Sequence, residues 1–158
     1  MVCNLPNTDG RLGVQSDAPA YFMSTEPIRA SRMETILIIE DEPHLREWYR
    51  QELEDRGYTV LSASHLREVE QMIRAHEVDL VVLDLKLKDG SGFDLLHEIL
   101  GRKKDIKVII HTAYPMFKGD FRSWGADAFL VKSSDLTELL QTIGRLLATE
   151  KNELPAYS

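Results

Sequence analysis

The sequence has 158 residues, a formal net charge of −7, 43% hydrophobic residues and 28% charged residues. These values are ordinary for a soluble globular domain, and the negative charge argues against nonspecific nucleic-acid binding, which usually needs a basic face. The single cysteine, Cys3, excludes a disulfide framework, and no apolar run is long enough to span a bilayer. Because the amino end also has no continuous apolar signal region, we expect a cytoplasmic protein.

The first 33 residues differ in character from the rest. They are rich in Pro, Gly, Ser, Asn and Asp and show no sustained periodicity, which predicts a disordered N-terminal extension over 1–33. The sequence leaves open whether Met33 is the true start of the protein. We expect one domain over 34–150, followed by a short tail over 151–158 that is too small for a second domain.

From residue 34 onward, short apolar runs alternate with longer amphipathic segments. The predicted strands are 35–39, 59–63, 79–84, 107–112 and 128–131. The predicted helices are 43–58, 66–76, 93–100, a weak stretch at 116–124, and 135–148. The stretch at 116–124 is weak because Pro115 precedes it and Gly119 lies within it. Continuous apolar strands alternating with helices predict an α/β, doubly wound, five-stranded parallel sheet with right-handed crossovers.

Acidic residues stand where ligands of such a sheet bind, at the carboxyl ends of the strands near the point where strand order reverses. Glu40 and Asp41 follow the first strand, and Asp84 ends the third. Thr112 ends the fourth strand and Lys132 follows the fifth. If the strand order is 2-1-3-4-5, the three acids converge on one spot, with the hydroxyl and the lysine close by.

Carboxylates this close together repel one another unless a cation lies between them. Mg²⁺ is a suitable cation, because it takes one or two carboxylates and also binds phosphate oxygens. A lysine and a hydroxyl can receive the remaining oxygens of a phosphoryl group, and an aspartate can itself be the nucleophile. The pattern therefore indicates a phosphoryl-transfer site. None of the five histidines forms a metal motif, and His111 is interpreted as a strand residue.

Five segments in register carry a family resemblance. They are IIEDE at 38–42, VVLDL at 81–85, Gly92, HTA at 111–113 and GADAFLVK at 125–132. Over residues 34 to 149 the chain resembles the receiver domain of two-component response regulators. The resemblance implies a flavodoxin-like (βα)5 fold with strand order 2-1-3-4-5, acting as a switch that signals through protein contacts.

The resemblance also implies roles for individual residues. Asp84 matches the phosphoacceptor, which takes a phosphoryl group from a sensor histidine kinase or phosphotransfer protein. Glu40 and Asp41 match the acidic pair that binds Mg²⁺ together with Asp84 and the backbone carbonyl of Lys86. Three further positions match the switch hydroxyl, the pocket lysine and the aromatic switch residue, and they are Thr112, Lys132 and Phe129.

Three positions depart from the usual receiver pattern. Ser133 follows the pocket lysine where most receivers have a proline, which puts the usual cis peptide in doubt. Lys88 stands four residues after Asp84, where proline is also common, and Phe129 has no hydroxyl. The large side chains of Lys86 and Tyr114 are expected to shield the acyl phosphate from water, which predicts slow autodephosphorylation.

The output of the domain is less well defined by the sequence. We expect no effector domain beside the predicted domain over 34–150, and we therefore expect signalling through a protein surface beside the predicted fourth helix, fifth strand and fifth helix. Phe117, Phe121 and Trp124 suggest a partner or homodimer surface there, although a core role for these aromatic residues is equally compatible with the sequence. No nucleic-acid or membrane partner is expected.

Two other functions remain as alternatives. One is a degenerate receiver that acts as a constitutive binding module, which the intact site residues argue against. The other is an aspartate-nucleophile phosphohydrolase. That class usually has a second acid two residues after the nucleophile, and Lys86 occupies the position. We therefore expect no enzyme activity beyond self-catalysed phosphoryl transfer and autodephosphorylation.

Overall fold

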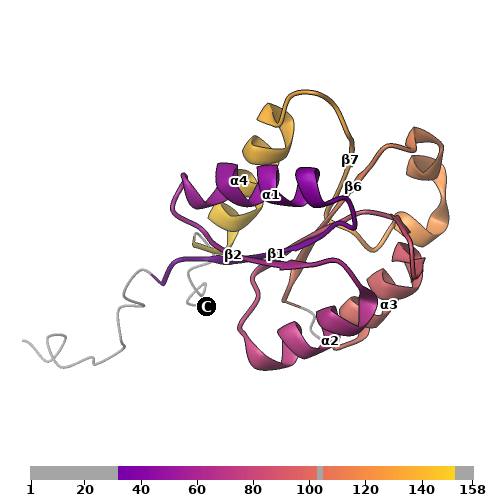
Figure 1. Ribbon diagram of the computed structural model, residues 1–158, viewed down its shortest axis with the longest axis horizontal. Helices are drawn as coiled ribbons and strands as arrows, with labels where there is room; N and C mark the ends of the chain where they lie inside the picture. Colours follow the sequence, from indigo (N-terminus) through magenta and orange to yellow (C-terminus); the bar gives the residue numbers. More distant parts are fainter. Residues whose placement is uncertain (1–31, 103–104, 152–158) are drawn as a thin grey trace, which may run out of the picture. The chain divides into compact units, whose positions relative to one another are not determined.

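The computed structural model of the protein describes residues 32–102 and 105–151 (Figure 1). Its main sheet has five parallel strands in the order β2-β1-β3-β6-β7. These strands are β1 (Thr35–Ile39), β2 (Thr59–Ala63), β3 (Leu80–Leu83), β6 (Lys107–Thr112) and β7 (Ala128–Val131). Since β6 and β7 are the fourth and fifth strands of this sheet, the predicted order 2-1-3-4-5 is confirmed.

In the described part of the chain, four α-helices connect and cover the strands. They are α1 (Pro43–Glu54), α2 (Leu66–Ala75), α3 (Gly92–Arg102) and α4 (Thr137–Lys151). Helices α1 and α4 lie on one face of the sheet, and α2 and α3 lie on the other (Figure 1). The turn after α1 contains Gly57 with φ of 89°, a left-handed conformation that glycine adopts without steric cost.

The core consists of two apolar layers, one on each face of the sheet. The β1 side chains alternate between them, so that Leu37 and Ile39 face one layer while Ile36 and Ile38 face the other. All four side chains are at most 1% exposed. A strand buried on both faces needs an unbroken apolar run, which explains why alternation is missing from its sequence.

The register of the strands brings their carboxyl ends to one edge. Ile39 of β1 pairs with Leu83 of β3, so Glu40 and Asp84 leave the sheet side by side. The Asp84 N–H donates to the Ile39 carbonyl at 3.0 Å. On the other side, the Lys132 N–H donates to the Thr112 carbonyl at 2.9 Å. The backbone thus gathers side chains from β1, β3, β6 and β7 at the switch point.

Two segments differ from the predicted elements. The loop after β3 contains a small antiparallel hairpin, made by β4 (Lys86–Leu87) and β5 (Gly90–Ser91). In place of the predicted weak helix at 116–124 there are two short 3₁₀ helices, η3 (Pro115–Gly119) and η4 (Phe121–Ser123). They are separated at Asp120, whose carboxylate accepts the Arg122 N–H at 2.9 Å. This local side-chain bond competes with a continuous helix.

Within residues 32–102 and 105–151, no helix is both long and apolar enough to cross a membrane. The predicted extension over 1–33 lies outside the described residues except for its last two positions, and Cys3 lies outside them as well. The predicted tail beyond residue 151 also lies outside.

Candidate functional site

Three acids meet at the carboxyl edge of the sheet. Glu40 and Asp41 follow β1 and Asp84 follows β3, and each of them offers a carboxylate oxygen within 4.8 Å of the others. Glu40 is 2% exposed and Asp84 is 7% exposed, whereas Asp41 is half-buried. The predicted convergence of these three acids is therefore what the structure contains.

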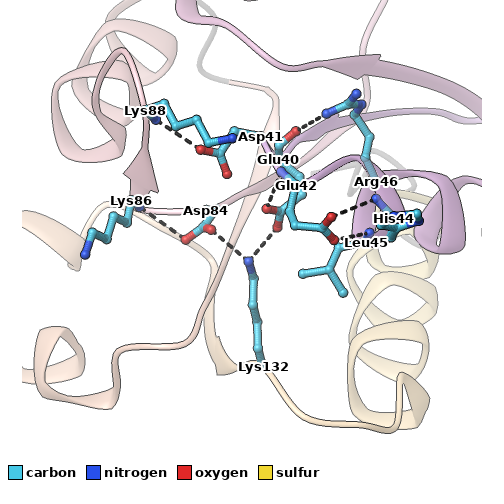
Figure 2. Close-up of polar contacts among 10 residues, drawn as sticks. All are labelled: Glu40, Asp41, Glu42, His44, Leu45, Arg46, Asp84, Lys86, Lys88 and Lys132. Atoms are coloured by element: carbon cyan, nitrogen blue, oxygen red, sulfur yellow. Dashed lines mark hydrogen bonds and ion pairs between the residues drawn. The ribbon is translucent and has the colours of Figure 1, made fainter.

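Lys132, which follows β7, bridges two of these acids (Figure 2). Its Nζ donates to Glu40 Oε2 at 2.5 Å and to Asp84 Oδ2 at 2.7 Å. Burial alone would lower the pKa of Lys132, but the hydrogen bonds to Asp84 and Glu40 outweigh it and raise the pKa. Burial raises the pKa of Glu40 even though the lysine opposes that shift. The ammonium group thus lies where the predicted site needs positive charge.

The start of α1 holds the backbone around Glu40. The Glu42 carboxylate caps this helix by accepting the backbone N–H groups of His44 at 3.1 Å and Leu45 at 2.7 Å. The Glu42 N–H in turn donates to Glu40 Oε1 at 3.2 Å. Arg46 donates to the Glu40 carbonyl at 2.8 Å (Figure 2). Glu42 is consequently a helix cap, and it leaves Glu40 and Asp41 to form the acidic pair.

The backbone around Asp84 is held by close packing against the start of α3. The Lys86 N–H donates to Asp84 Oδ1 at 3.2 Å, and the Gly92 N–H donates to the Leu85 carbonyl at 3.0 Å. A Cβ at position 92 would lie 2.5 Å from the Asp84 carbonyl oxygen and 2.6 Å from Leu85 Cα. Only glycine, which has no Cβ, allows the two backbone segments to approach this closely, so the turn requires glycine at position 92.

Asp41 has a partner that the sequence did not indicate. Its Oδ2 accepts the backbone N–H of Lys88 at 3.1 Å (Figure 2). The two residues are 47 positions apart in sequence, and the contact depends on the folded shape of the β4–β5 hairpin. The only available signal was that position 88 is not proline and so keeps its N–H.

Thr112 ends β6 and is fully buried. Within the part of the chain that the structure describes, its Oγ1 and the neighbouring His111 Nδ1 are buried without a hydrogen-bond partner. The His111 ring lies 5.4 Å from the buried Tyr49 ring, and burial lowers the pKa of His111 to about 4. A buried polar atom without a partner is unusual and is a reason to look for a ligand. His111 is a buried strand residue, as the sequence interpretation had it.

Lys86 and Tyr114 contact each other. The Lys86 side chain extends away from Asp84 (Figure 2), and its Nζ donates to the Tyr114 hydroxyl at 2.9 Å. The same Nζ lies 4.9 Å from the centroid of the Tyr114 ring.

Phe129 lies within β7, half-buried, and packs against the apolar layer beneath α2 and α3. The peptide between Lys132 and Ser133 is trans, so the lysine reaches the two acids without a cis bond.

The donor set suits a hard divalent cation. Three carboxylates converge, and among the described residues the Lys132 ammonium group forms ion pairs with Glu40 and Asp84 but not with Asp41. Carboxylate oxygens are the ligands that Mg²⁺ prefers, and a net negative cluster gains from such an ion. The buried Thr112 hydroxyl adds a donor that could bind an anionic oxygen beside it.

The fold and the site place the chain among the doubly wound α/β proteins that have an acidic site at the carboxyl edge of the sheet. Comparison with known proteins identifies the family. The family model of the response regulator receiver domain matches residues 36–144 of this chain. The chain belongs to this family.

Relatives and solved structures agree with this assignment. The chain is 36% identical over 119 residues to the DNA-binding transcriptional regulator NtrC of Rhizobium meliloti, covering 74% of this chain and 25% of NtrC. The response regulator TrrA of Thermotoga maritima, solved in complex with Mg²⁺ and BeF, has 37% identity and a TM-score of 0.69, covering 72% of this chain and 99% of TrrA. TrrA solved with the histidine kinase ThkA matches with the same identity and TM-score, over 73% of this chain and 99% of TrrA.

The chain spans about a quarter of the length of NtrC and of a second curated relative, the response regulator PilR of Pseudomonas aeruginosa, which is 34% identical over 75% of this chain. The similarity to these regulators concerns the receiver part alone.

Proposed function

We propose that this receiver is a phosphorylation-dependent switch in which Asp84 accepts a phosphoryl group from a histidine kinase or a phosphotransfer protein. The observation that carries the proposal is the placement of Asp84, whose carboxylate lies at the switch point between the Lys132 ammonium group and the Lys86 N–H. In the transfer, an Asp84 oxygen bonds to phosphorus while the bond to the donor's imidazole nitrogen breaks. Water later hydrolyses the acyl phosphate. TrrA, which was solved with a histidine kinase, supports this class of donor.

Glu40, Asp41, Asp84 and the Lys86 carbonyl would hold Mg²⁺, which supplies charge neutralisation for the phosphoryl oxygens when it is bound. Lys132, which contacts Asp84, would turn its ammonium group from the acids toward a phosphoryl oxygen. The buried Thr112 hydroxyl is a donor for a second oxygen. Phe129 would then respond to the movement of Thr112 through the burial of its ring.

The contact between Lys86 and Tyr114 supports a role for both residues in the lifetime of the phosphoprotein. Each side chain follows a site residue by two positions, and together they form a bridge between the β4–β5 hairpin and the start of η3. This bridge would restrict the approach of water from that side. We expect slow autodephosphorylation as the consequence.

The output surface is proposed on η3, η4, β7 and α4. Phe121 and Trp124 are 72% and 76% exposed, and Met116 is also exposed. Phe117, by contrast, is half-buried and packs edge-on against Phe93, with ring centroids 5.4 Å apart. Phe117 thus packs toward the core, whereas Phe121 and Trp124 are exposed to solvent. A downstream protein or a second copy of the chain in the cytoplasm would bind the exposed pair.

One experiment distinguishes the proposed switch from its alternatives. The protein is incubated with Mg²⁺ and acetyl phosphate, and its intact mass is measured. A single phosphoryl adduct that is lost in Asp84→Asn supports the switch. No adduct on the wild-type protein would instead favour a constitutive binding module, and continued phosphate release from varied phosphoesters would favour a phosphohydrolase.

A further inference from the structure

The β4–β5 hairpin contacts the acidic cluster at one point. The backbone N–H of Lys88 donates to Asp41 Oδ2 at 3.1 Å (Figure 2). The Lys88 residue is exposed. Among the described residues, the Asp41 carboxylate accepts no other hydrogen bond. This bond contacts the most exposed of the three acids.

The hairpin is anchored independently of the acids, on both sides of Lys88. Leu87 is 6% exposed and belongs to the apolar layer beneath α2 and α3. The Asp89 carboxylate accepts the N–H of Leu66, the first residue of α2, at 2.9 Å. Gly90 also packs against Leu66, since a Cβ there would lie 2.5 Å from Leu66 Cδ1. Because both neighbours are held, the Lys88 N–H is a fixed donor.

A fixed donor can position a carboxylate without occupying it. Each carboxylate oxygen accepts more than one partner, so Asp41 Oδ1 and a free lone pair of Oδ2 remain for a cation. The bond restricts the rotation of the Asp41 side chain before the cation arrives, which removes part of the entropy cost of binding. Groups that orient metal ligands in this way typically change metal affinity by about 10- to 100-fold.

We propose that the Lys88 backbone amide positions Asp41 for Mg²⁺ and ties the β4–β5 hairpin to the metal site. This inference rests on the proposed function, in which Asp41 is a metal ligand. The group that acts is the N–H and not the lysine side chain. Residue 88 therefore affects the metal through whether it has an amide hydrogen, and only proline lacks one.

The test compares Lys88→Pro, which removes the N–H, with Lys88→Ala, which keeps it. Mg²⁺ binding is measured by titration calorimetry at one pH and ionic strength, with circular dichroism as the check on folding. We expect Lys88→Ala to bind Mg²⁺ within about twofold of wild type and Lys88→Pro to bind about tenfold more weakly. Equal affinities of the two variants would overturn the inference. Failure of the wild-type protein to bind Mg²⁺ would instead overturn the proposed function.

A second measurement decides the matter if Lys88→Pro does not fold. Amide hydrogen exchange is followed at Lys88 in the wild-type protein and in Asp41→Ala, without metal. We expect the Lys88 amide to exchange at least about tenfold faster in Asp41→Ala, because a bond worth about 1.4 kcal/mol is lost. An amide that is unprotected in wild type, or equally protected in both proteins, contradicts the inference.

Discussion

Replacing Lys132 by methionine should destabilise the protein strongly in the absence of a divalent cation and weakly in its presence. The Lys132 ammonium group contacts Asp84 at 2.7 Å, and both Asp84 and Glu40 are at least nine-tenths buried. At an effective dielectric constant of about 20, a charge pair at 2.7 Å interacts by about 6 kcal/mol. The cost of desolvating the charges offsets much of this energy, so the pair itself contributes little net stability. Removing only the Lys132 ammonium group costs more than removing the whole ion pair, because two buried carboxylates are then left without a positive partner.

The expected loss is about 3 kcal/mol in the free energy of unfolding, the lower end of the range for breaking a buried pair. It lies at the lower end because Glu40, whose pKa is already raised by burial, can take up a proton. With saturating Mg²⁺ the difference from wild type should shrink to below about 1 kcal/mol, since the ion neutralises the same carboxylates and stabilises by binding.

Urea denaturation of wild type and Lys132→Met, in EDTA and in Mg²⁺, measures the loss of unfolding free energy without and with the ion. Lys118→Met is the matched control, because Lys118 is exposed and its replacement changes the net charge equally. A loss below about 1 kcal/mol in EDTA would show that the buried carboxylates do not need the Lys132 charge. A loss that is the same in EDTA and Mg²⁺ would refute the claim that the ion replaces the lysine as counter-charge.

Three further predictions concern the surroundings of the site. Burial lowers the pKa of His111 to about 4 in the folded protein, so its neutral form contributes stability that is complete above pH 6.5 and is lost as the pH falls toward 4. Between pH 6.5 and pH 4, the free energy of unfolding of wild type should fall by about 3 kcal/mol more than that of His111→Asn, as measured by urea denaturation. Parallel pH profiles of the two proteins would contradict this. Gly92→Ala should cost about 2 kcal/mol in thermal unfolding because its Cβ meets backbone atoms, whereas Gly144→Ala, which meets nothing within 4 Å inside α4, should gain about 0.5–1 kcal/mol. Combined replacement of Lys86 by asparagine and Tyr114 by alanine should shorten the half-life of the phosphoprotein several-fold, and an unchanged half-life would remove both residues from that role.

The sheet and the acids could be predicted because both depend on regular backbone geometry. A parallel strand buried on both faces requires a continuous apolar run, and the residue after it must lie at the carboxyl edge of the sheet. Glu40 and Asp84 follow directly from this rule, since paired strands end together at Ile39 and Leu83. Lys132 follows from the same rule applied to β7.

The parts that the sequence did not predict depend on irregular backbone and on contacts between distant residues. The bond from the Lys88 N–H to Asp41 involves a main-chain group, which leaves no side-chain pattern in the sequence. The division of the aromatic residues in η3 and η4 has a similar origin. Short 3₁₀ turns have no sustained hydrophobic face, so periodicity could not separate the half-buried Phe117 from the exposed Phe121 and Trp124.

Trapping the acyl phosphate shows directly whether Asp84 carries the phosphoryl group. After incubation with Mg²⁺ and acetyl phosphate, borohydride reduces an aspartyl phosphate to homoserine, and peptide mass spectrometry then locates the change. We expect homoserine at position 84, none without Mg²⁺ and none in Asp84→Asn. Homoserine at another aspartate, or none at position 84 in a protein that binds Mg²⁺, would contradict it.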